Sequence, residues 1–91
     1  MNTYPLTIST PDGRVFSGEA QGLFVRAALG DIAILAGHIP LMTTVQPGQC
    51  RIRLPEGQER KATIAGGLLT VGREGTILLT QEWHEEPSKD R

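Results

Sequence analysis

Two histidines and one cysteine are the residues of this 91-residue chain whose side chains most readily do chemistry near neutral pH. His38 lies in the run GHIPLM, His84 lies in the charged C-terminal segment, and Cys50 is the single cysteine. A nucleophilic site needs a base within reach of a serine or cysteine, and a third group that orients the base. No signature in the sequence places Cys50 or a serine beside His38. We therefore predict that the chain has no catalytic residues and is not an enzyme.

Metal and phosphate sites are also poorly supported by the spacing of the residues. His84, Glu85 and Glu86 are contiguous, and contiguous side chains do not share one face of a strand or helix. Gly66-Gly67 is followed by the strand-like segment LLTV, whereas a phosphate-binding loop needs Gly-Lys-Ser/Thr at the start of a helix. The sequence predicts no metal and no cofactor.

The overall composition excludes further classes of partner. Nine Lys+Arg and ten Asp+Glu give a net charge of -1, so no basic stripe is expected to bind nucleic acid or an anionic membrane. Neither a signal peptide nor about 18 consecutive apolar residues is present, which argues against direct membrane insertion. A single cysteine is compatible with a reducing compartment such as the cytoplasm.

The elements that would position these residues are strands. Leu6 and Ile8 alternate with polar residues, and Pro11-Asp12-Gly13 supplies a turn. In the same way Cys50, Ile52 and Leu54 are expected on one face of a strand and the intervening arginines on the other. Further strands are expected at residues 14–16, 22–25, 31–35, 60–64, 68–71 and 76–80, with Gly/Pro-rich turns between them.

The spacing of these strands predicts the fold class. Short strands at intervals of roughly 8 to 12 residues, with no long helical period, indicate an all-β protein. We expect an antiparallel β-sandwich or flattened barrel of about ten short strands. Residues 1–81 would form this single domain, and the charged residues 82–91 would form a frayed tail.

The pattern around His38 leaves its role open. An exposed loop with apolar residues and a proline is typical of a protein-binding surface, but Leu41 and Met42 fit a core equally well. The chain could also be a small ligand-binding or nucleic-acid-binding barrel, although its aromatic residues are few.

A resemblance to a known family decides between these readings. Residues 30–48, GDIAILAGHIPLMTTVQPG, resemble the segment of the F-type ATP synthase epsilon subunit in which Gly-His-x-Pro-Leu is followed by Thr and then by Pro-Gly. The segments FSGE (residues 16–19), RIR (51–53) and AGGLLTV (65–71) resemble further segments of that family in the same order. Asp31, Ala33 and Ala36 depart from the family pattern, which commonly has Glu, Gly and Pro there.

The resemblance implies a function without chemistry and without a small-molecule substrate. In this family an N-terminal β-sandwich docks on the gamma subunit and on the polar loops of the membrane rotor ring, the c-ring. A C-terminal helical hairpin usually follows, and residues 81–91 are too short for it. The chain is thus expected to be a non-catalytic rotor subunit that couples proton or sodium flow to ATP synthesis or hydrolysis, without the regulatory hairpin. Its expected place is the cytoplasmic face of a bacterial plasma membrane.

The resemblance also implies two sets of contact residues. The loop from Arg26 to Asp31 would face the c-ring. Its contact residues would be Arg26, Ala28, Gly30 and Asp31. The contacts to the gamma subunit would be Thr10, His38, Ile39, Pro40, Leu41, Met42 and Thr43. In this assignment His38 is a polar contact and its neighbours supply apolar area.

Overall fold

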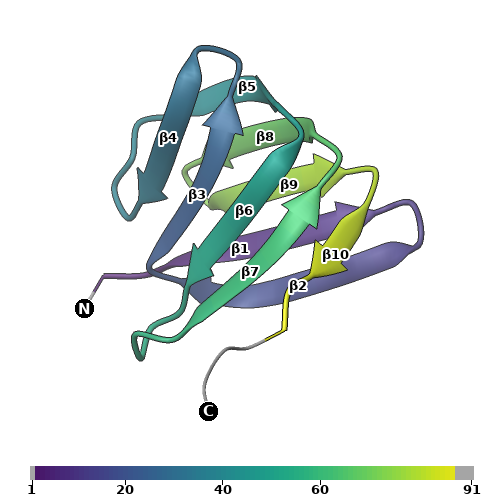
Figure 1. The fold of residues 1–91 in the computed structure, drawn as a ribbon. Helices are drawn as coiled ribbons and strands as arrows, with labels where there is room; N and C mark the ends of the chain where they lie inside the picture. Colours follow the sequence, from purple (N-terminus) through teal and green to yellow (C-terminus); the bar gives the residue numbers. More distant parts are fainter. Residues whose placement is uncertain (1, 88–91) are drawn as a thin grey trace.

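The computed structural model describes residues 2–87, and these form ten strands and no helix (Figure 1). The strands are β1 (Tyr4–Thr10), β2 (Gly13–Ala20), β3 (Gly22–Ala27), β4 (Gly30–Leu35), β5 (Leu41–Val45), β6 (Gly48–Arg53), β7 (Glu59–Ile64), β8 (Gly67–Gly72), β9 (Gly75–Thr80) and β10 (Trp83–Glu85). The described residues include no helix of the length and apolarity that a membrane crossing requires.

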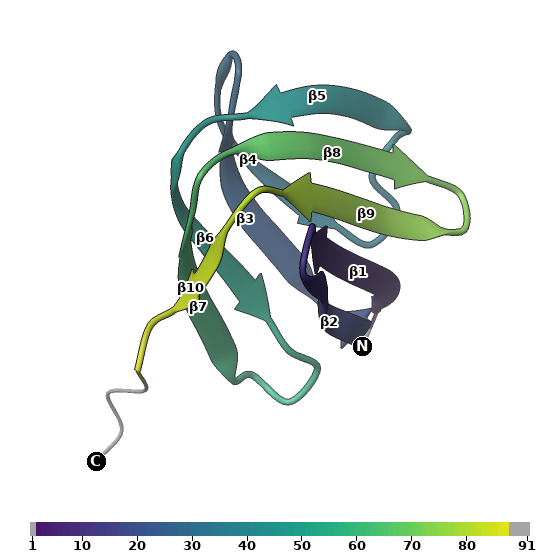
Figure 2. The ribbon, with the colours of Figure 1, turned by 90° about the vertical axis from the view of Figure 1, so that its right-hand side faces the viewer.

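All ten strands belong to one sheet that folds over itself. The order is β10-β7-β6-β3-β5-β8-β9-β1-β2, with β4 paired to β3. One layer holds β4, β3, β6, β7 and β10, and the second holds β5, β8, β9, β1 and β2 (Figures 1 and 2). The prediction of an all-β sandwich or flattened barrel is confirmed. One pairing departs from the antiparallel expectation: β1 and β9 are parallel, which is possible because most of the chain lies between them and supplies the crossover.

The core lies between the two layers and is filled from alternate positions of the strands. The largest fully buried side chains come from six of the strands: Leu6, Ile8, Leu23, Ile34, Ile52, Leu69 and Leu78, joined by Cys50. Each buried leucine or isoleucine contributes about 1.5–3 kcal/mol relative to an exposed one. The expected alternation in β6 is correct, since Cys50 and Ile52 are fully buried while Arg51 and Arg53 lie outside.

The start of β8 requires a glycine. A Cβ atom at Gly67 would overlap the carbonyl oxygen of Leu79 and lie 2.9 Å from the Cα atom of Thr80, both in the backbone of β9. At the other end of β8, a Cβ atom at Gly72 would meet nothing closer than the carbonyl oxygen of Gly75 at 3.8 Å. The two strands therefore touch backbone to backbone at one end of their pairing only.

We expect Gly67→Ala to lower the free energy of unfolding by about 3 kcal/mol or more, because neither backbone can move away without breaking the β8–β9 ladder. Gly72→Ala is the matched control in the same strand and is expected to change stability by less than about 1 kcal/mol. Urea denaturation of both variants measures the difference. Equal effects of the two substitutions would contradict the close approach.

The C-terminal segment is more ordered than the sequence suggested. Residues 82–91 were expected to fray, but Trp83–Glu85 form β10, which pairs with β7 and places Trp83 against the core. The Arg60 guanidinium donates to both oxygens of Glu85, at 2.9 and 2.7 Å, and the indole nitrogen of Trp83 donates to Glu85 at 3.0 Å. The Trp83 ring and the paired Glu85 carboxylate thus attach this otherwise charged segment to the rest of the domain. Residues 88–91 lie outside the described residues.

The attachment of β10 should depend on pH. Hydrogen bonds from Arg60 lower the pKa of the Glu85 carboxyl, with a smaller contribution from Trp83. Because the folded-state pKa is below the unfolded value of about 4.3, the stabilisation is present above that pH and is lost as the pH falls through the folded pKa.

We expect Glu85→Gln to be less stable than the wild type at pH 7 by no more than about 1 kcal/mol, since the pair is substantially exposed to solvent. The difference should shrink as the pH falls through the folded-state pKa of Glu85 and disappear below it, where the carboxyl is protonated in both the folded and the unfolded chain. Unfolding free energies measured at several pH values provide the test. A difference that stays constant as the pH is lowered from 7 to the acid limit of folding would show that the carboxylate charge has no part in holding β10.

Candidate docking surfaces

The three residues with potentially reactive side chains, His38, Cys50 and His84, lie apart and in different environments. His38 is exposed on the β4–β5 loop, where its backbone N–H donates to the Leu35 carbonyl and its Nδ1 lies 2.8 Å from the Ile39 carbonyl oxygen. His84 is exposed on β10 beside Glu82. Cys50 is completely buried, and burial raises the pKa of its thiol to about 12. In residues 2–87 no group of His, Cys, Asp and Glu side chains is arranged to hold a metal ion.

In the segment that follows His38, some side chains face outward and others face the core, because side chains alternate along β5. Ile39, in the loop, is 74% exposed, and Met42, the second residue of β5, is 68% exposed. Leu41 points the other way and packs against the core, and Thr43, two residues further on, is half-buried on that same side. The sequence treated Ile39 to Thr43 as one contact segment, but only part of it presents a side chain to the outside.

The exposed side of β5 continues across the sheet as an apolar surface. Cross-strand pairing places Met42 beside Thr70, Thr70 beside Ile77, and Leu68 beside Leu79. We call Met42, Leu68, Ile77 and Leu79 the outer apolar face. These four side chains are 68%, 37%, 47% and 48% exposed. They lie on β5, β8 and β9, which follow one another in Figure 2.

Three of these four residues were missed from the sequence, although a signal was present. The strand TILLT in β9 has three consecutive apolar residues, and GLLTV in β8 has two. Consecutive apolar residues in a strand place apolar groups on both faces, which is typical of strands that are covered on both sides. The sequence placed β8 and β9 as strands without drawing that consequence.

Thr10 lies at the edge of the same layer. It ends β1, and its hydroxyl accepts a hydrogen bond from the Asp12 N–H and donates to the Gly13 carbonyl oxygen. A shallow groove of about 400 Å³ runs from Thr10 past Leu68 and Leu79. Thr10 therefore borders the outer apolar face on the side of Leu68 and Leu79.

The second predicted contact region is the tip of the β3–β4 hairpin. Arg26 and Asp31 face each other across the two strands, with Nε 3.1 Å from Oδ1. The tip residues Ala28 and Leu29 are exposed, and the Leu29 side chain is completely so. In Figure 2 this hairpin projects beyond β5. The tip and the His38 loop lie at opposite ends of the six-residue strand β4, about 20 Å apart.

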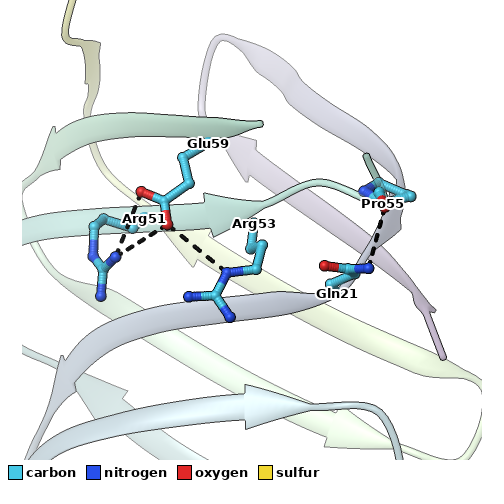
Figure 3. Close-up of polar contacts among 5 residues, drawn as sticks. All are labelled: Gln21, Arg51, Arg53, Pro55 and Glu59. Atoms are coloured by element: carbon cyan, nitrogen blue, oxygen red, sulfur yellow. Dashed lines mark hydrogen bonds and ion pairs between the residues drawn. The ribbon is translucent and has the colours of Figure 1, made fainter. Parts of the chain in front are cut away.

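The outer face of the other layer has a different character. The guanidinium groups of Arg51 and Arg53 lie 4.5 and 5.0 Å from the centre of the Phe24 ring. Both arginines also pair with Glu59 of β7, at 3.3 and 3.8 Å (Figure 3). The same figure shows Gln21 donating to the Pro55 carbonyl oxygen. This face is polar, and its arginines are already engaged.

Comparison with known proteins identifies the family. Residues 3–86 match the family described as ATP synthase, Delta/Epsilon chain, beta-sandwich domain. The chain belongs to this family. The ATP synthase epsilon chain of Persephonella marina is 38% identical over 79 residues, which are 87% of this chain and 58% of that protein. The epsilon chain of Bacillus velezensis is 35% identical over 91 residues, covering all of this chain and 68% of that protein. The resemblance to epsilon subunits found in the sequence is thus confirmed.

A solved structure supports the fold independently. A chain in the structure of the Euglena gracilis mitochondrial ATP synthase, described as OSCP/F1/c-ring in rotational state 1, superimposes with a TM-score of 0.86 at 22% identity. The match covers 91% of this chain and 53% of that chain. This chain therefore spans a little over half the length of several of the proteins it resembles.

The buried state of Cys50 can be tested directly. We expect the thiol of the native protein not to react with an aromatic disulfide reagent at pH 8, because both burial and the raised pKa suppress the thiolate. Full reaction is expected once the chain is unfolded in guanidinium chloride. Absorbance of the released thiol follows both reactions, and fast reaction of the native protein would reopen a nucleophilic role for Cys50.

Proposed function

We propose that this chain is an epsilon subunit of the central stalk of an F-type ATP synthase, where it docks on the gamma subunit and on the c-ring. It is a non-catalytic part of the rotor, and it is peripheral to the membrane through the complex, on the cytoplasmic side in a bacterium. Its task in coupling ion flow to ATP synthesis or hydrolysis is to hold its partners in a fixed arrangement.

The observation that carries the proposal is the outer apolar face. Met42, Leu68, Ile77 and Leu79 form one exposed surface across three neighbouring strands of a small domain. Soluble monomers seldom leave large contiguous apolar surfaces uncovered, whereas the centres of stable interfaces are apolar. We assign this face, together with Thr10 and the exposed residues from His38 to Met42, to the gamma subunit.

The hairpin tip with Arg26, Ala28, Gly30 and Asp31 is assigned to the c-ring. The tip projects at the opposite end of β4 from the His38 loop. Two partners can therefore be contacted at the same time without competing for one surface. Membership of the epsilon family supports this assignment.

The rival function, a ligand-binding or nucleic-acid-binding barrel, finds less support. Single-stranded nucleic acid is usually bound by exposed aromatic rings in a basic groove. Here Phe24 lies under Arg51 and Arg53, and both arginines pair with Glu59, so neither the ring nor the cations are free.

We expect Leu79→Asp to weaken binding to the gamma subunit of the same source by a hundredfold or more, about 3 kcal/mol, because docking would bury an unpaired carboxylate. His38→Ala should cost only about 0.5–1.5 kcal/mol, the net value of one polar contact. Isothermal titration calorimetry with the gamma subunit measures both variants.

Lys61→Asp is the matched control, since it places the same residue on the exposed side of β7 in the opposite layer. Its affinity for gamma should equal that of the wild type. Thermal unfolding of each variant confirms that the sandwich is intact. Wild-type affinity of Leu79→Asp, or no binding by the wild type itself, would overturn the proposed function.

A further inference from the structure

Leu29 is the most exposed large apolar side chain among the described residues. Its relative exposure is 102%, whereas Ile39 and Met42, the next in order, are 74% and 68% exposed. Leu29 lies at the two-residue turn of the β3–β4 hairpin, next to Gly30, whose φ of +131° allows the tight return into β4. No other side chain of the described residues covers it.

The hairpin that carries Leu29 is held in place by two backbone hydrogen bonds to one neighbouring segment. The Ala28 N–H donates to the Thr44 carbonyl oxygen at 3.2 Å, and the Gln46 N–H donates to the Arg26 carbonyl oxygen at 2.7 Å. These bonds fasten the tip to the end of β5. Because the backbone at Leu29 is already ordered, binding costs only the rotamer freedom of its side chain, as suits an interface anchor.

The charges next to Leu29 compensate each other. Arg26 and Asp31, directly opposite in the hairpin, are paired at 3.1 Å. The tip therefore presents no net charge, and a partner selected by charge would first have to break this pair. The remaining recognition group at the tip is the leucine.

We propose that Leu29 is the anchor of the hairpin tip and inserts into an apolar pocket between protein loops of the rotor ring, with Arg26 and Asp31 acting on each other to orient the hairpin. This inference rests on the proposed function and specifies the chemistry of its ring contact. Recognition at the tip is then apolar and insensitive to salt, although ion pairs would be the obvious expectation for this loop.

A protein pocket fits Leu29 better than a lipid surface does. Stable membrane attachment takes far more buried hydrocarbon than one leucine side chain, or a polybasic segment in addition. The tip has a single exposed leucine and its one cation, Arg26, is paired. A pocket in a protein can enclose one side chain completely and obtain its full burial.

The test compares Leu29→Ser with Asp31→Asn in the full chain. Each is titrated onto the detergent-solubilised complex of gamma subunit and rotor ring, and separately onto the gamma subunit alone. We expect Leu29→Ser to bind the complex at least about tenfold more weakly than the wild type. The ratio should be the same at about 0.05 and 0.5 M salt, because an apolar contact is not screened. Asp31→Asn removes the charge of a contact residue that is already paired within the tip, so it should lose less than about threefold. Leu29→Met should recover most of the affinity that Leu29→Ser loses.

The outcomes separate this inference from the proposed function. A larger loss for Asp31→Asn than for Leu29→Ser, or a Leu29→Ser effect that fades with salt, would overturn the anchor. So would wild-type binding to vesicles of phosphatidylglycerol and phosphatidylcholine that Leu29→Ser abolishes. Equal affinity of the wild type for gamma alone and for the complex would overturn the anchor and leave gamma docking standing. Absence of binding to gamma would overturn the proposed function itself.

Discussion

The two-residue period of the strand is the constraint on which this molecule depends. Every strand gives one set of side chains to the core between the two layers, so the other set alone is available for contact with partners. On β6 and β7 that outward set is charged, and its members pair with one another. On β5, β8 and β9 it is largely apolar. The domain therefore has one polar outer face and one apolar outer face. This difference, and not any reactive group, decides which face is suited to a protein interface.

The fold was largely predictable because its signals are local. Alternation in Leu6–Ile8 and Cys50–Leu54, and turns such as Pro11-Asp12-Gly13, mark strands without knowledge of the rest of the chain. Pairings between distant segments, such as the parallel contact of β1 with β9, have no such signal. The same holds for β10, where order comes from a tryptophan reaching a core made elsewhere and from Arg60 of β7.

The residues proposed for contact were predictable only in part, and for a similar reason. A resemblance identifies positions along the chain, so it found the His38 loop and the hairpin from Arg26 to Asp31. It does not tell which side chains of a strand face outward, and alternation turns Leu41 towards the core. Nor does it reveal that Leu68 and Leu79, remote from both segments in the sequence, lie on the same side of the sheet as Met42.

The separation of the two proposed contact regions would have a mechanical consequence. A single flat apolar interface resists being pulled apart, but apolar contacts have little directionality and resist sliding poorly. A second contact about 20 Å away, at the far end of β4, would resist such sliding, because the domain could not slide at the first contact without also being displaced at the second. An anchor such as Leu29 is effective there only because the hairpin is fastened to β5 by backbone hydrogen bonds. In a rotating assembly, stiffness between two such contacts would matter more than the strength of either.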